Sequence, residues 1–176
     1  AGYWKNTPAT EQAIVDDWFH TGDVGTIDHD GFLAITDRKK DLFVTSAGKN
    51  VAPAIIERLL TADPLFEQAV VYGDGRKFIS AVVVPNLDLL ETVAENLGCA
   101  IDCQDGCVTT TQLLDFIDSK VQHLMQVVSQ PERVKKCLVL ENPFGLADDE
   151  LTATLKVRRR HIIAKYEDQL ETFYNQ

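Results

Sequence analysis

Three short segments of this sequence place charged residues where they could contact a nucleotide or another anion. In residues 18–23, Gly22 permits a tight turn and Asp23 places a carboxylate at the exit of that turn. A carboxylate can accept hydrogen bonds from two vicinal hydroxyls, as it does when a protein binds a ribose. The plainer interpretation is that Asp23 is only a turn residue, because Thr-Gly-Asp is a common tripeptide. Residue types alone favour the plainer interpretation.

The second and third segments each contain one cation of interest. Residues 37–41 read Asp-Arg-Lys-Lys-Asp, in which Arg38 could form paired hydrogen bonds to a phosphate or ribose oxygen or could lie in a solvated turn. Lys156 follows an acidic loop and stands at the expected start of a helix. A lysine there is usually a surface charge, but it also suits transient contact with phosphate or carboxylate. Composition does not decide between these alternatives.

Hydrophobic patterning predicts the elements that would position the first two segments. Thr10 is the expected N-cap of a short helix that starts at Glu11. Two apolar runs around an Asp-His-Asp-Gly turn predict a β-hairpin, and a second hairpin follows around residues 46–49. Pro53 then starts a helix whose buried face is expected to hold four aliphatic residues: Ile55, Ile56, Leu59 and Leu60.

The rest of the chain alternates short strands with amphipathic helices. We expect strands at 68–72, 78–84 and 134–140, helices at 87–97, 112–128 and 156–173, and a loop at 141–149. Short strands mixed with segregated helices indicate the α+β class.

Composition excludes several kinds of function. The net charge of -10 disfavours a surface that binds nucleic acid or acidic membranes. The apolar runs are too short for a transmembrane segment. Cys99, Cys103 and Cys107 do not have zinc-site spacing, so we expect reduced thiols in a loop and no metal. The chain lacks an initiator Met and an apolar signal core, and is expected to begin within something longer.

Taken together and in this order, the three segments resemble the AMP-forming superfamily of acyl-CoA synthetases, luciferases and peptide-synthetase adenylation domains. The resemblance begins at Gly2-Tyr3-Trp4, ends in the final helix, and is weakest over residues 95–111. It includes Gly-Phe-Leu at 31–33, Ser-Ala-Gly-Lys-Asn-Val-Ala-Pro at 46–53 and Leu-Thr-Ala-Thr-Leu-Lys at 151–156. The forms Lys-Lys-Asp and Gly-Lys-Asn-Val-Ala-Pro resemble those of the long-chain acyl-CoA synthetases.

The resemblance implies a role for each matching position in the first half of the chain. Asp23 would bind the ribose hydroxyls of ATP, and Arg38 would contact the nucleotide at its ribose or phosphates. Lys40 would be the hinge on which a small C-terminal domain rotates. Residues 1–38, including a hairpin, would then be the tail of a large adenylation domain, and residues 39–176 would be the small lid domain, with a β-hairpin and a short mixed sheet flanked by helices.

The resemblance also implies two sites in the small domain. Ala47, Gly48 and Lys49 would line the channel for the pantetheine arm of CoA, where a glycine permits close approach. Lys156 would be the catalytic residue, reaching the large domain to stabilise charge on the carboxylate and α-phosphate. Ala153 replaces a proline that the family often has there, which suggests a more flexible loop.

The implied parent is a fatty acid–CoA ligase that forms an acyl-adenylate and then an acyl-CoA thioester. Its substrates would be ATP with Mg²⁺, CoA and a fatty acid, and its partner would be the large N-terminal adenylation domain of the same polypeptide. It would be cytoplasmic, with membrane association left open, and this chain alone would be inactive. Two alternatives remain: an adenylate-forming enzyme with another acceptor, and a stand-alone, non-catalytic binding module.

Overall fold

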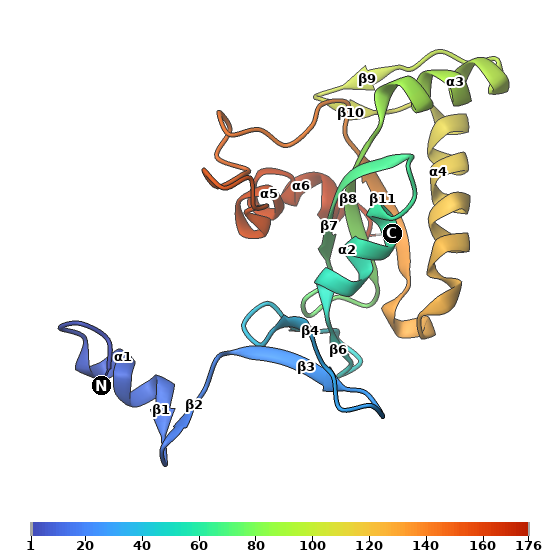
Figure 1. Cartoon of the computed structure of the whole chain (residues 1–176). Helices are drawn as coiled ribbons and strands as arrows, with labels where there is room; N and C mark the ends of the chain where they lie inside the picture. The colour runs from blue at the N-terminus through green and yellow to red at the C-terminus, as the bar shows by residue number, and fades with distance from the viewer. Residues whose placement is uncertain (1, 176) are drawn as a thin grey trace. The chain divides into compact units, whose positions relative to one another are not determined.

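The computed structural model describes residues 2–175 (Figure 1). The chain divides into two compact units, residues 1–42 and residues 43–176. We refer to them as unit 1 and unit 2.

Unit 1 contains one short helix and two small antiparallel sheets. Helix α1 (Thr7–Ala13) leads into β1 (Ile14–Val15), which pairs with β2 (Trp18–Phe19). The expected N-cap at Thr10 is wrong, because the Asn6 side chain caps α1 by accepting from the Ala9 N–H at 3.1 Å. The expected hairpin is confirmed as β3 (Asp23–Ile27) and β4 (Leu33–Arg38). The Asp28 side chain closes its turn by accepting from two backbone N–H groups, those of Asp30 and Phe32.

The core of unit 2 is a mixed, three-stranded sheet of order β11-β8-β7. Strand β8 (Ile79–Pro85) runs antiparallel to β7 (Phe66–Tyr72) and parallel to β11 (Val134–Val139). Every residue of β8 is buried, as expected for a central strand that is covered on both faces. The short mixed sheet expected from the sequence is confirmed.

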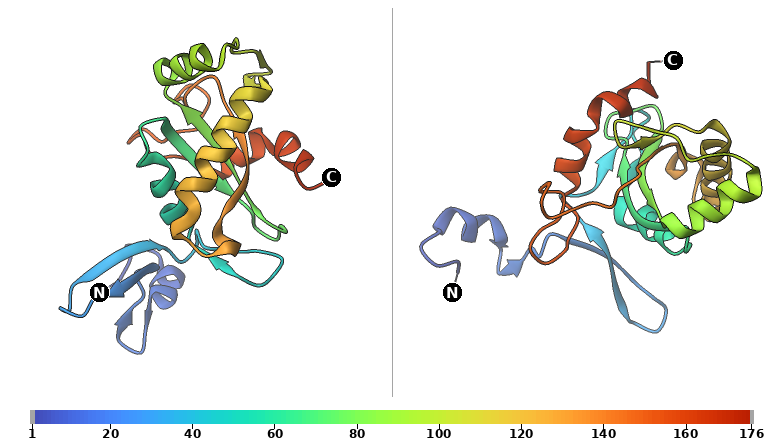
Figure 2. Two further views of the ribbon diagram at one scale, coloured as in Figure 1. Left: turned by 90° about the vertical axis from the view of Figure 1, so that its right-hand side faces the viewer. Right: turned by 90° about the horizontal axis from the view of Figure 1, so that it is seen from above.

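Helices cover both faces of this sheet (Figure 2). Alternate residues of β7 face opposite sides, so Val71 packs in one cluster and Val70 in the other. The first cluster includes residues of α2 (Pro53–Thr61), α3 (Leu87–Leu97) and α4 (Thr111–Leu124). The second includes residues of α5 (Arg159–Lys165) and α6 (Glu167–Thr172). The helices therefore sandwich the sheet, and the α+β class is confirmed.

The ends of these helices follow local capping rules. Helix α3 has the bounds expected from the sequence, because the Asn86 side chain caps its start and Gly98, with φ of 67°, ends it. Helix α4 ends at Leu124 and continues as the 3₁₀ turn η1 (Met125–Val127), before η2 (Gln130–Glu132). On α2, Ile56 and Leu60 are buried as expected, whereas Ile55 is exposed.

Two other expectations about unit 2 are wrong. The cysteine-containing loop holds a small hairpin, β9 (Cys103–Gln104) and β10 (Cys107–Val108), around an Asp-Gly turn. The expected final helix at 156–173 is instead α5 and α6, which meet at Tyr166, and Lys156 precedes the first of them.

The second expected hairpin is confirmed as β5 (Phe43–Val44) and β6 (Asn50–Val51). No helix within residues 2–175 has the length and apolar character needed to cross a membrane.

Candidate functional site

The two residues expected to contact a nucleotide are neighbours in unit 1. Asp23 opens β3 and Arg38 closes β4, and they are cross-strand partners. The Arg38 Nε donates to Asp23 Oδ1 at 2.8 Å, and its Nη1 donates to the Thr21 carbonyl at 3.2 Å. The Arg38 side chain remains 57% exposed, so it can still donate to another group. The sequence identified both residues but gave no sign of their pairing.

Lys40 lies in the turn that follows this pair. The Arg38 carbonyl accepts from the N–H of Asp41 at 2.9 Å and of Leu42 at 3.3 Å, which closes the turn. Lys40 is exposed there. Its role as a hinge stays a prediction.

The turn between β5 and β6 presents Ala47, Gly48 and Lys49 to solvent. It is closed by the Gly48 N–H, which donates to the Thr45 carbonyl at 2.8 Å, and by the Thr45 N–H, which donates to the Lys49 carbonyl at 3.0 Å. Gly48 has φ of 78°, which favours glycine. A Cβ added there would meet no atom within 4 Å among the described residues, so the turn itself leaves room for a larger side chain.

Lys156 lies in a compact loop, residues 151–157, that we call the Lys156 loop. Leu151 and Val157 form an isolated β-bridge at its base. Within it, the Thr152 N–H donates to the Lys156 carbonyl at 2.8 Å, and the Lys156 N–H donates to Thr152 Oγ1 at 3.0 Å. The backbone of Lys156 is therefore fixed while its side chain is exposed.

Glu150 anchors the base of the Lys156 loop. Its buried carboxylate accepts from the Gly145 N–H and from Lys165 Nζ, each at 2.9 Å. Its carbonyl accepts from the Arg158 N–H at 2.7 Å, which joins the two ends of the loop. The hydrogen bond to Glu150 raises the pKa of the Lys165 ammonium above its usual range, so this clamp stays charged at neutral pH.

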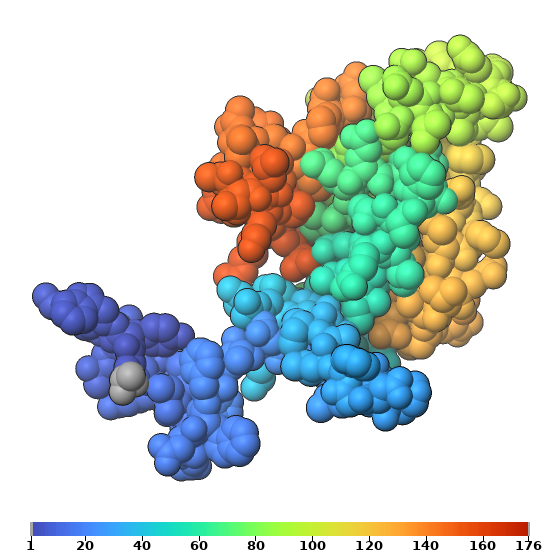
Figure 3. All heavy atoms as spheres, viewed as in Figure 1, coloured from blue at the N-terminus to red at the C-terminus, as the bar shows by residue number. Residues whose placement is uncertain are grey.

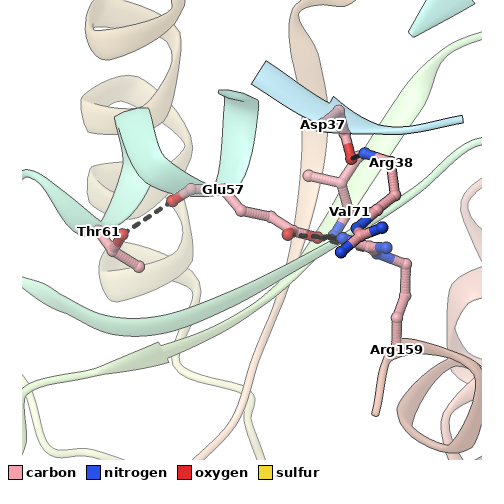
Figure 4. A network of polar contacts seen from close by, with 6 residues as sticks. All are labelled: Asp37, Arg38, Glu57, Thr61, Val71 and Arg159. Carbon is pink, nitrogen blue, oxygen red and sulfur yellow. Dashed lines mark hydrogen bonds and ion pairs between the residues drawn. The ribbon is translucent and has the colours of Figure 1, made fainter. Parts of the chain in front are cut away.

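A second anchor follows the Lys156 loop and was missed in the sequence. Residues 158–160 are three consecutive arginines, and the Arg159 Nε and Nη2 donate to Glu57 Oε1 at 3.1 and 3.0 Å (Figure 4). Nη2 also lies 2.7 Å from Glu57 Oε2. Arg158 forms an ion pair with Asp149, and Arg160 is exposed. No local pattern could have shown a partner 102 positions away.

The Gly48 turn and the Lys156 loop belong to different regions of unit 2. Figure 1 shows the hairpin of β5 and β6 at one end of the sheet, whereas the segment that precedes α5 lies toward the other. The orange segment before α5 forms part of the molecular surface in Figure 3. The two expected sites are therefore not parts of one cavity within unit 2.

Comparison with known proteins supports the resemblance. A profile of the AMP-binding enzyme C-terminal domain matches residues 40–176. Over 99% of its length the chain is 40% identical to the long-chain-fatty-acid–CoA ligase FadD15 of Mycobacterium tuberculosis, and 35% identical to long chain acyl-CoA synthetase 1 of Arabidopsis thaliana. It spans 29% and 27% of the lengths of these relatives.

Solved structures agree in fold. The adenylation domain of a carboxylate reductase from Mycobacterium chelonae superposes with a TM-score of 0.81 at 26% identity, over 99% of this chain and 26% of that one. The corresponding domain from Segniliparus rugosus, in complex with AMP, gives a TM-score of 0.79 at 25% identity, over 99% and 26% of the two chains. The chain belongs to the AMP-binding enzyme C-terminal domain family.

Proposed function

We propose that this chain is the C-terminal part of an ATP-dependent long-chain fatty acid–CoA ligase. The observation that carries the proposal is the 40% identity to a long-chain-fatty-acid–CoA ligase along nearly the whole chain. The large N-terminal adenylation domain of the same polypeptide is the partner, and the substrates are a fatty acid, ATP with Mg²⁺, and CoA. The enzyme is cytoplasmic, and any membrane association is made through the rest of the polypeptide.

The proposed reaction has two steps. A carboxylate oxygen of the fatty acid attacks the α-phosphorus of ATP, and the bond to pyrophosphate breaks to leave an acyl-adenylate. The CoA thiol, after losing its proton to solvent, attacks the acyl carbonyl carbon, and AMP leaves with the bonding electron pair. The small domain turns about Lys40 between the steps, as a hinge closure of a familiar kind.

Each candidate site in the chain has one task in this scheme. Lys156 supplies a positive charge in the first step, where negative charge gathers between the carboxylate and the α-phosphate. Asp23 accepts from the ribose hydroxyls, and Arg38, which is half-exposed beside it, donates to the nucleotide. In the second step Ala47, Gly48 and Lys49 line the channel for the pantetheine arm. The open space at Gly48 is consistent with that role.

The test uses the full-length protein that contains this chain. We expect pyrophosphate exchange into ATP that depends on a long-chain fatty acid, and an acyl-CoA product identified by mass spectrometry. Lys156→Ala should remove the exchange, and Arg160→Ala, which changes a nearby exposed cation, should not. A protein that shows no exchange with any long-chain fatty acid would contradict the proposal.

One observation favours a second candidate for the thiol that accepts the acyl group, in place of CoA. The two carboxylate reductase domains superpose at TM-scores of 0.81 and 0.79, and a related structure contains such a domain joined to a carrier domain. The acceptor could then be the phosphopantetheine thiol of a carrier domain. Single-turnover transfer from acyl-adenylate to free CoA and to a phosphopantetheinylated carrier domain separates the two. Faster transfer to CoA supports the ligase.

A further inference from the structure

We propose that Arg159, held by Glu57, is a positioning residue that fixes the Lys156 loop for adenylation, an inference that rests on the proposed function. Arg159 is the first residue of α5 and follows Lys156 by three positions. It does not point to solvent as its basic neighbours would suggest, since its side chain is 24% exposed and is paired with a carboxylate that is 18% exposed. Neither residue belongs to the sites described for the reaction.

The geometry of this pair restrains direction as well as distance. Glu57 receives three donor contacts from the guanidinium, from Nε and Nη2 to its Oε1 and from Nη2 to its Oε2. The planar guanidinium matches the carboxylate only in a narrow range of orientations, unlike the point charge of a lysine. The pair therefore fixes where α5 begins, and so where the Lys156 loop ends.

Glu57 is itself held by the core of unit 2. It lies on α2, between the buried residues Ile56 and Leu60 of that helix. Its Oε1 also accepts from the Val71 N–H of β7 at 2.9 Å (Figure 4). One part-buried carboxylate thus connects a core helix, a core strand and the first residue of α5, and it ties the end of the Lys156 loop to the packed core of unit 2.

Two side-chain pairs secure the loop, in addition to the hydrogen bond from the Arg158 N–H to the Glu150 carbonyl that joins its two ends. Glu150 and Lys165 hold the base on the side where the loop begins, and Glu57 and Arg159 hold the side where it continues into α5. Leu155, inside the loop, has φ of 59°, a conformation that a leucine rarely adopts unless its surroundings impose it. Loss of either clamp should let this residue relax and should displace the neighbouring Lys156.

The functional test compares Arg159→Ala, Arg159→Lys and Glu57→Gln in the full-length protein with Arg160→Ala as the matched control. Glu57→Gln keeps an oxygen for the Val71 N–H and removes the charge that holds Arg159. A misplacement of about 1 Å can cost about a hundredfold in rate, so we expect pyrophosphate exchange to fall about tenfold to a hundredfold in kcat with Arg159→Ala and Glu57→Gln. The kcat of exchange should fall almost as far with Arg159→Lys, because a lysine keeps the positive charge but lacks the planar, paired donors of the guanidinium.

Two further readouts separate positioning from a general loss of structure. Thioester formation from supplied acyl-adenylate should stay within about twofold, because Lys156 has no task in that step. Arg159→Ala should cause little further loss of pyrophosphate exchange in a protein that already carries Lys156→Ala, because that protein has no ammonium left to position. Equal losses in both steps, or a full additional loss in the double variant, would overturn the inference.

A measurement on the 176-residue chain needs no activity. Hydrogen exchange at the Lys156 and Arg158 amides, which are hydrogen-bonded to Thr152 and Glu150, should quicken at least tenfold in Arg159→Ala and stay unchanged in Arg160→Ala. The inference alone is overturned if hydrogen exchange at these amides is unchanged in Arg159→Ala. It is also overturned if the pyrophosphate exchange activity of Arg159→Ala equals that of Arg160→Ala. An unmodified full-length protein that forms no acyl-adenylate overturns the proposed function, and with it the catalytic part of the inference.

Discussion

Replacing Lys156 with alanine in the full-length protein should impair one half of the reaction and spare the other. Lys156 is exposed, and no ion pair of its ammonium is present among residues 2–175. A surface substitution of this kind changes the free energy of unfolding by no more than about 0.5 kcal/mol. Any large loss of activity must therefore arise in the reaction and not in the fold.

The size of the loss follows from the task that we assign to the ammonium. Removing one positioned donor from a developing charge typically costs about 2.7–4 kcal/mol, which is about a hundredfold to a thousandfold in rate. We expect that loss in fatty-acid-dependent pyrophosphate exchange. Thioester formation from purified acyl-adenylate should change by less than about threefold, because the loop that holds Lys156 and the Gly48 turn lie in different regions of unit 2.

Two controls make this result decisive. Arg160→Ala removes an exposed cation four positions further on and should leave both half-reactions unchanged. Acetylation of Lys156 removes its charge and should reproduce the alanine variant. The reasoning is refuted if Arg160→Ala slows exchange as much as Lys156→Ala does, because a diffuse basic surface would then explain the effect. It is also refuted if both half-reactions fall equally.

The remaining predictions concern four other residues of the chain. Gly48→Leu should spare pyrophosphate exchange and slow thioester formation at least tenfold, and Gly48→Asn, which tolerates a positive φ, should restore the rate only if the glycine is needed for the turn alone. Lys40→Pro fixes φ and removes an N–H, so a hinge there predicts unequal losses in the two half-reactions, and equal losses contradict it. Burial raises the pKa of Tyr174 from its ordinary value near 10 to about 12. As the pH rises, the unfolded chain therefore loses this proton before the folded chain does, and the free energy of unfolding should fall between these two pH values. Urea titrations of the 176-residue chain and of its Tyr174→Phe variant measure this fall. Ile117 is fully buried on α4, so Ile117→Ala should lower the free energy of unfolding by about 2–5 kcal/mol, measured by the same urea titrations.

Elements that depend on local chemistry could be predicted from the sequence. Asn86 caps the start of α3 and Gly98 ends it, and the predicted bounds of this helix agree with the structure. The Asp-Gly turn at residues 30–31 marked the hairpin of β3 and β4 in the same way. The signal for β9 and β10 was also present, as Asp105 and Gly106, but the strands are so short that no apolar alternation flanks the turn.

Features that depend on distant partners could not be predicted. Residues 156–173 have an apolar pattern close to that of one helix, yet the Lys156 loop stays outside the helix because Thr152 and Glu150 bind the backbone N–H groups of Lys156 and Arg158. Arg159 and Arg160 look alike in the sequence, and only the position of Glu57 distinguishes them. The pairing of Asp23 with Arg38 likewise depends on the register of two strands.

The placement of β8 has a consequence for how the chain acquires its fold. The hairpin of β7 and β8 can form as soon as both strands exist, but β11 joins β8 only after roughly 55 more residues have been added, and closing so long a loop is entropically slow. Until then, β8 offers an unpaired edge of almost wholly apolar residues to other chains. Newly made protein should therefore pass through an interval in which it is prone to aggregate. Slowing synthesis after residue 85 should lengthen that interval, whereas slowing it after residue 140 should not.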